Sequence, residues 1–158
     1  MAQRRNTSLP AVLASAPLRT IRAEVAGGTY AFPGPELARL ADRGLLQRVA
    51  NGYYIVVPQD MIGRVWAPRL EAAAAGIASA IYGATHAVLM GISAARVLGV
   101  VPRALATAVV AVPDQHRPIR LKDRQSVVRF VKRDTLGVGH RHDARADPPR
   151  PRTSTSTR

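Results

Sequence analysis

The sequence of 158 residues contains no cysteine, only ten acidic residues, and few aromatics. Without cysteine there is no disulfide framework, no thiolate metal site and no cysteine nucleophile. No uninterrupted apolar run reaches the roughly 18 residues of a transmembrane helix, so no membrane span is expected. The length suits one ordinary domain or two small ones, which excludes a large multidomain enzyme.

Basic residues dominate the charge: 23 lysines and arginines give a formal net charge of +13. Such an excess favours nucleic acid as a partner, because neutralising phosphates releases their counterions. The alternative is compositional, since GC-rich genomes encode much arginine and alanine. The excess is not confined to one tail, and both halves of the chain carry it.

The first residues partly imitate a secretory signal. Arg4 and Arg5 precede an apolar stretch, and Ala14-Ser15-Ala16 has the small residues of a cleavage site. However, the apolar stretch is short and contains Pro10, which favours an amphipathic first helix. We therefore expect a cytoplasmic protein without a membrane partner.

The first half has the pattern of short helices followed by a hairpin. Residues 9–26 predict one or two helices broken near Pro17, because Leu18, Ile21 and Val25 recur at helical spacing. A further helix is expected over 35–43. Asn51-Gly52 between two apolar runs predicts a β-hairpin with a type I′ turn.

The second half mixes both kinds of element, so the expected fold class is α+β. Helices are expected over 68–82 and 93–98, and strands over 108–112, 119–121 and 126–131. The short apolar run 86–90 fits either a strand or the next helix. Trp66 is expected to join the two halves in the core, with one of Tyr53 and Tyr54 facing inward. From about residue 134 large apolar residues almost vanish, which predicts a disordered tail.

A basic helix followed by a tight hairpin is the arrangement of a winged helix-turn-helix. In that arrangement the helix enters the major groove and the hairpin contacts the backbone or the minor groove. Arg39 and Arg43 would project from the recognition helix, with Arg48 and Asn51 on the hairpin. The alternative is a solvated helix face beside an ordinary hairpin.

Support for catalysis is thin. His86 and His116 stand far apart without a zinc-binding spacing, and both fit structural roles better. No nucleophile elbow and no glycine-rich phosphate loop occurs. We expect no enzyme activity, no cofactor and no metal. A non-specific basic nucleic-acid-binding protein, associated with RNA or ribosomes, and a small nucleic-acid-processing enzyme remain alternatives.

Several segments in their order resemble the AbiEi-type antitoxins of type IV toxin–antitoxin systems. The similarity lies in residues 37–40, 44–49, 52–56, 77–78 and 90–99, and it extends over roughly residues 30–133. The resemblance implies a winged helix-turn-helix domain at 8–58 and a partial antitoxin-like α+β domain at 66–133.

The resemblance also implies a function. Such a protein would bind double-stranded DNA of its own operon promoter, as a possible homodimer, and repress transcription. Its antitoxin half would counteract a nucleotidyltransferase-like toxin without a stable complex. Carried over by position, Arg39, Arg43, Arg48 and Asn51 are the DNA-binding candidates. No catalytic residue is implied.

The end of the chain departs from that family. Residues 137–153, GVGHRHDARADPPRPRT, can be written in G/C-rich codons whose one-base shift reads WATVTTPEQTLLDLAR. The shifted text is amphipathic and resembles the family at this point. We therefore hypothesise that residues 134–158 are a frameshift product and that the antitoxin domain is incomplete. The nucleotide sequence tests this directly.

Overall fold

The computed structural model describes residues 9–134, which form a mixed α+β fold with four α-helices and two sheets. The tail beyond Asp134 lies outside the described residues. In the described residues no helix is long and apolar enough to cross a membrane. The helices are α1 (Ala11–Ala14), α2 (Pro33–Asp42), α3 (Leu70–Tyr82) and α4 (Ile92–Val97), and short 3-10 turns lie between several elements.

The first sheet is antiparallel and has the strand order β1-β3-β2. Its strands are β1 (Thr20–Arg22), β2 (Leu46–Ala50) and β3 (Tyr53–Val56). One face packs on α1 and α2 through a cluster of buried apolar side chains that includes Leu13, Ile21, Leu37, Leu40, Leu46 and Tyr54. This arrangement fixes α2 against the hairpin that follows it.

The second sheet has the order β4-β5-β7-β6. Its strands are β4 (Val88–Leu89), β5 (Thr107–Val112), β6 (Ile119–Arg120) and β7 (Val127–Lys132). β5 and β7 are parallel, and β4 and β6 pair antiparallel at the two edges. Val110, Val112, Val128 and Phe130 point from this sheet into a core beneath α3.

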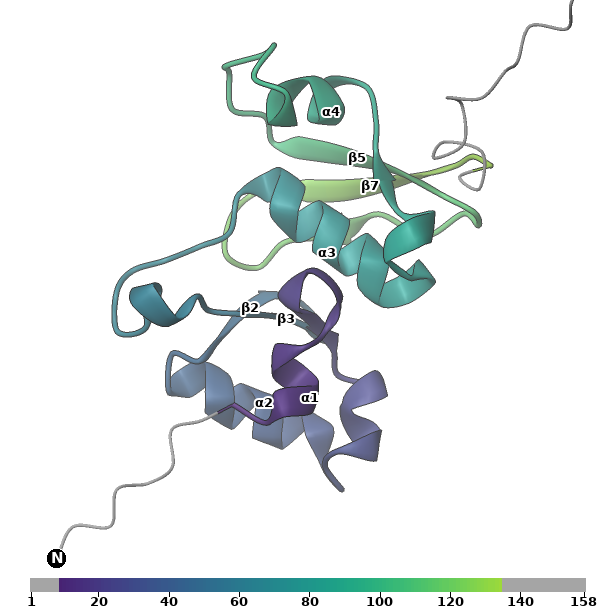
Figure 1. The fold of residues 1–158 in the computed structure, drawn as a ribbon. Helices are drawn as coiled ribbons and strands as arrows, with labels where there is room; N and C mark the ends of the chain where they lie inside the picture. Colours follow the sequence, from purple (N-terminus) through teal and green to yellow (C-terminus); the bar gives the residue numbers. More distant parts are fainter. Residues whose placement is uncertain (1–8, 135–158) are drawn as a thin grey trace, which may run out of the picture.

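Helix α3 lies between the two sheets, so the layers run helix, sheet, helix, sheet (Figure 1). The core around α3 contains Val49, Tyr53 and Ile55 of the hairpin as well as the second sheet, and Trp66 packs at its border. The ranges 8–58 and 66–133 therefore share one core, and their division into two domains stays a prediction. Both tyrosines are buried, because Tyr54 faces the α2 side of the sheet.

The expected helix over the second part of 9–26 is wrong. After α1 and a 3-10 turn at Pro17–Arg19, residues Thr20–Arg22 form β1 and pair with β3. Ile21 is buried in the sheet and Val25 is exposed, so their helical spacing reflects no shared face. Pairing with a central strand supplied hydrogen bonds that outweighed the local pattern.

The hairpin at Asn51-Gly52 is confirmed, but its turn is not type I′. Among the non-glycine residues that the structure describes, only Leu18 and Arg19 have positive φ, whereas type I′ requires it at Asn51 as well. Gly52 has a φ of 78°. The register of β2 against β3 shifts between Arg48 and Ala50, and this irregularity accommodates a turn that is not type I′.

The remaining expected elements are confirmed with shifts of one or two residues at their ends, as the bounds of α2, α3, α4, β5, β6 and β7 show. The apolar run 86–90 contains β4, a strand of two residues. Val109, Arg129 and Val131 lie on the face of the second sheet away from α3. These side chains are half-buried or exposed and belong to neither core cluster.

Substitution of Gly76 by alanine should destabilise the protein. A Cβ at this position would lie 2.0 Å from Oγ1 of Thr20, a buried residue of β1. Relieving such overpacking costs about 1–3 kcal/mol, and chemical denaturation measures the change in the free energy of unfolding. Gly34→Ala on α2 is the matched control, because a Cβ there meets nothing within 4 Å. Equal effects of the two substitutions would contradict the close packing of α3 on β1.

Candidate nucleic-acid interface

Helix α2 separates its apolar and charged side chains cleanly. Pro33 occupies its first turn, where the missing N–H costs nothing. Leu37 and Leu40 are buried against the first sheet, and the exposed face carries Arg39 and Arg43 four residues apart. The sequence thus forms an amphipathic helix whose outer face is basic.

The two helix arginines differ in their partners. An Nη1–H of Arg39 donates to Oε1 of Glu36 at 2.9 Å, on the exposed surface one turn earlier in the helix. Arg43 follows the last helical residue and is exposed. An exposed ion pair contributes little to stability, so the Arg39 guanidinium can exchange Glu36 for another anion at small cost.

The hairpin places Arg48 and Asn51 together. An Nη2–H of Arg48 donates to Oδ1 of Asn51 at 2.9 Å, and both residues are exposed. Arg48 is opposite Tyr54 in the register and its guanidinium lies 6.0 Å from the ring centroid. Directly opposed residues share a face of a sheet. Arg48 therefore lies on the same side of the sheet as α2.

The back of the hairpin is held by the core. Val49, Tyr53 and Ile55 pack with α3, while Leu46 and Tyr54 pack with α2. The backbone N–H of Lys122 also donates to the carbonyl of Val49 at 2.8 Å. The basic tip thus stands on a strand pair that is fixed on both faces, an attachment that sequence reasoning missed.

The four residues selected from the sequence, Arg39, Arg43, Arg48 and Asn51, belong to two adjoining elements on one side of the first sheet. Their groups are guanidinium and amide, which donate to phosphate oxygens and to base edges. The only carboxylates on α2 are Glu36 and Asp42. The surface can therefore act as an anion-binding face.

Sequence reasoning assigned Leu18 to a helix and gave no role to Arg19, and it selected neither as a site residue. Both have positive φ, 47° and 55°, in a region that residues with a Cβ rarely adopt. No sequence pattern could have found them, because glycine and asparagine are the usual signals of this conformation.

Two histidines lie in the described residues, His86 and His116, and both have local contacts. His86 Nδ1 lies 3.1 Å from Thr85 Oγ1, and the His116 ring lies 4.9 Å from the Phe130 ring. In the described part of the chain no group of three or more histidine, aspartate or glutamate side chains could hold a metal ion.

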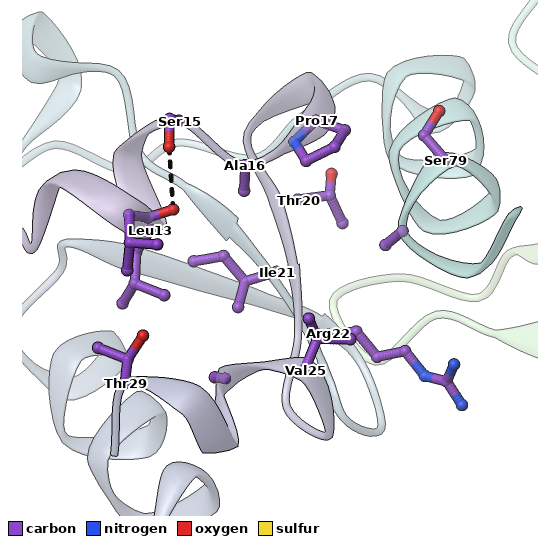
Figure 2. Close-up of a pocket in the computed structure, with 13 residues that line it drawn as sticks. Leu13, Ser15, Ala16, Pro17, Thr20, Ile21, Arg22, Val25, Thr29 and Ser79 are labelled. Carbon is purple, nitrogen blue, oxygen red and sulfur yellow. Dashed lines mark hydrogen bonds between the residues drawn. The ribbon is translucent and has the colours of Figure 1, made fainter. Parts of the chain in front are cut away.

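A hollow of about 370 Å³ lies between residues 12–29 and α3. Figure 2 shows Leu13 on one side, Ser79 of α3 on the other, and Thr20 and Ile21 of β1 between them. The walls are mainly apolar. The Ser79 side chain is buried, and its hydroxyl has no hydrogen-bond partner within the described residues.

No protein-family model, no curated protein and no solved structure matches the chain.

Two buried serines should respond oppositely to alanine. Ser79→Ala removes a hydroxyl without a partner and should raise the free energy of unfolding by about 1 kcal/mol. Ser93 is the matched control, because its Oγ accepts a hydrogen bond from the Val109 backbone N–H at 2.9 Å. Ser93→Ala should cost about 1–3 kcal/mol by leaving that N–H unsatisfied. Chemical denaturation compares them, and a destabilising Ser79→Ala would contradict the assignment.

The stability of the protein should fall at high pH partly through Tyr53. Burial raises the pKa of its phenol, and the nearby Arg22 guanidinium offsets only part of this effect. Above about pH 10 the unfolded chain therefore loses this proton first, and the free energy of unfolding falls until the folded pKa is passed. Tyr53→Phe should show a shallower fall between about pH 9.5 and 11, measured by denaturation. Tyr30→Phe is the control, and identical slopes for Tyr53→Phe and wild type would refute the effect.

Proposed function

We propose that this protein binds double-stranded DNA through α2 and the β2–β3 hairpin. The observation that carries the proposal is that four exposed side chains lie on one side of the first sheet, the side of α2. They are Arg39 and Arg43 on the helix, and Arg48 and Asn51 at the hairpin. A helix and a hairpin presented together match the two contacts of a winged helix-turn-helix, in which the helix enters the major groove.

The order of elements also supports a winged-helix arrangement. A short helix, a strand, a 3-10 turn (Val25–Gly28), the helix α2 and a hairpin follow one another, and β1 pairs with the returning strand β3. Helix α2 has ten residues, and an α-helix with its side chains is about 10–12 Å in diameter, which fits a major groove about 12 Å wide. In the mechanism, Arg39 and Arg43 reach base edges or phosphates from the helix, and the hairpin residues contact the backbone.

Affinity for phosphates is expected from the whole charge distribution. The net charge of +13 supplies a non-specific, salt-dependent attraction. Specificity has to come from the few side chains that contact base edges, because phosphate contacts carry no sequence information. A homodimer on repeated sites would supply affinity that one small module lacks.

The biological role that we propose is autorepression by an antitoxin of a type IV toxin–antitoxin system. Its support is the resemblance of residues 37–40, 44–49, 52–56, 77–78 and 90–99 to AbiEi-type antitoxins, together with the basic side chains on α2 and the hairpin. The functional partner would be a nucleotidyltransferase-like toxin encoded beside it. If the antitoxin domain is incomplete, apolar side chains on the outer face of the second sheet should be left partly uncovered. Val109 and Val131, which are half-buried, support this hypothesis.

A binding titration tests the DNA interface. The chain should prefer DNA from its own upstream region to scrambled DNA by about 1,000-fold, the low end for specific regulators. Arg39→Ala and Arg43→Ala should each weaken specific binding by about 1–3 kcal/mol if they contact bases. A substitution at a phosphate contact, expected for Arg48→Ala, should lower the salt slope by about one. Fluorescence anisotropy over a salt series gives both quantities.

The matched control is Arg129→Ala, which removes the same charge from the outer face of the second sheet. It should leave the preference between the two DNAs unchanged. Equal binding of both DNAs by the wild type, or equal losses from Arg39→Ala and Arg129→Ala, would mean that the chain acts as a bulk polycation and would overturn the proposal.

A further inference from the structure

A second surface lies along the exposed side of α3, away from the residues assigned to DNA. Two adjoining hollows of about 600 and 330 Å³ share Leu18, Arg19, Arg69 and Ala72 in their walls. One continues past Ala75 to Arg96 and Val97, and the other continues to Pro58 and Trp66. We call this continuous surface the α3 groove.

The groove exposes large apolar side chains to solvent. Leu18 is 58% exposed and Val97 is 62% exposed, and they stand in the wall of the same hollow. The floor between them includes the small side chains of Ala72 and Ala75 on the outward face of α3. Apolar walls around a shallow floor of small residues favour an apolar side chain as occupant over a fully hydrated group.

The groove also carries unneutralised positive charge. The exposed guanidinium groups of Arg19 and Arg69 have no ion pair or side-chain hydrogen bond within residues 9–134. The third arginine, Arg96, is paired with the buried carboxylate of Glu71. Two cations thus flank an apolar surface without a counter-ion, which selects an acidic partner.

The backbone is strained at Leu18 and Arg19, two residues in the walls of the α3 groove. Their φ values of 47° and 55° fall in the left-handed region, where a Cβ costs about 1–2 kcal/mol per residue. Glycine would avoid that cost at both positions. Yet both side chains are exposed, so burial in the core does not repay the strain. Strain at exposed residues that border one groove points to a binding role for their side chains.

We propose that the α3 groove binds an acidic amphipathic segment of another protein. Apolar side chains of that segment would lie against Leu18, Ala72 and Val97, and its carboxylates would pair with Arg19 and Arg69. A helix with apolar anchors three and four residues apart suits an open groove of this kind. The groove is open and elongated, so it suits a chain segment better than a compact small molecule, which is normally enclosed.

This proposal is independent of DNA binding. Most groove residues come from the turn after α1, from the start of α3 and from α4. Ile55 and Val56 of the hairpin strand β3 also line it, but none of the four DNA candidates on α2 and the hairpin lines either hollow. Loss of one activity should therefore leave the other intact, and the failure of either proposal does not decide the other.

A displayed library of random peptides of about 16 residues, long enough to form a helix on binding, tests the groove with the full chain as bait. Selected peptides should be rich in glutamate or aspartate, with apolar residues at spacings of three and four. Their affinity for the protein is then measured by fluorescence anisotropy with synthetic peptides, in the presence of excess duplex DNA to occupy the other basic face.

Glycine substitutions at the two strained positions should remove groove side chains without a loss of stability. Leu18→Gly and Arg19→Gly suit a positive φ, so each should keep or raise stability while it removes one groove side chain. Each of these two, and Arg69→Ala, should weaken peptide binding at least about tenfold, or 1.4 kcal/mol. The matched controls are Leu98→Ala, another exposed apolar residue outside the groove, and Arg129→Ala. Both should bind like the wild type.

Three results would overturn the proposal. One is that selection yields no peptide binder. Another is that the selected peptides are not acidic, or bind the control variants as weakly as the groove variants. The third is that duplex DNA displaces the peptides competitively, because the groove would then belong to a nucleic-acid surface.

Discussion

The structure depends on helix α3, which has to carry small side chains on both of the sides that pack against sheets. Helix α3 packs on β1 and the hairpin with one side and on β5 and β7 with another. Alanines 73, 74 and 78 are fully buried in it, and Gly76 lets Thr20 approach to a distance that a Cβ would not allow. Close-packed interiors tolerate no such extra atom without movement. The short side chains of α3 therefore set the distance between the two sheets.

The same packing holds the hairpin that carries Arg48 and Asn51 on both of its faces. The hairpin contributes Tyr53 to the α3 core and Tyr54 to the α2 core, so adjacent side chains of one strand anchor it to two layers. A recognition surface mounted on such a strand loses little conformational entropy on binding. The hairpin tip is also short, so its reach toward a ligand is limited to Arg48 and Asn51.

The two proposed surfaces differ in the partners of their arginines and in the strain of their backbone. At the proposed DNA face, Arg39 and Arg48 are held by exposed partners, Glu36 and Asn51, which orient them and can be exchanged at low cost. At the α3 groove, Arg19 and Arg69 have no such partner in the described residues, and the backbone itself orients Arg19. The first arrangement suits a phosphate surface with many equivalent contacts, and the second suits one defined partner.

Much of the fold could be predicted from the sequence where periodicity was strong. The bounds of α3 and β5 follow from their apolar spacing, and Asn51-Gly52 identified the hairpin. β1 could not be predicted, because three residues carry no period and their pairing with β3 is a long-range contact. For the candidate site, residue type selected Arg39, Arg43, Arg48 and Asn51. Arg48 could be placed on the α2 side only from its register with Tyr54, and the positive φ of Leu18 could be found only in the structure.

The most direct test of the account is an NMR titration of the full chain with duplex DNA from its own upstream region. The account predicts that the largest amide shift changes fall within residues 33–56, on α2 and at the tip of the β2–β3 hairpin. Changes centred on the basic residues of 117–133, or spread evenly over the basic surface, would contradict it.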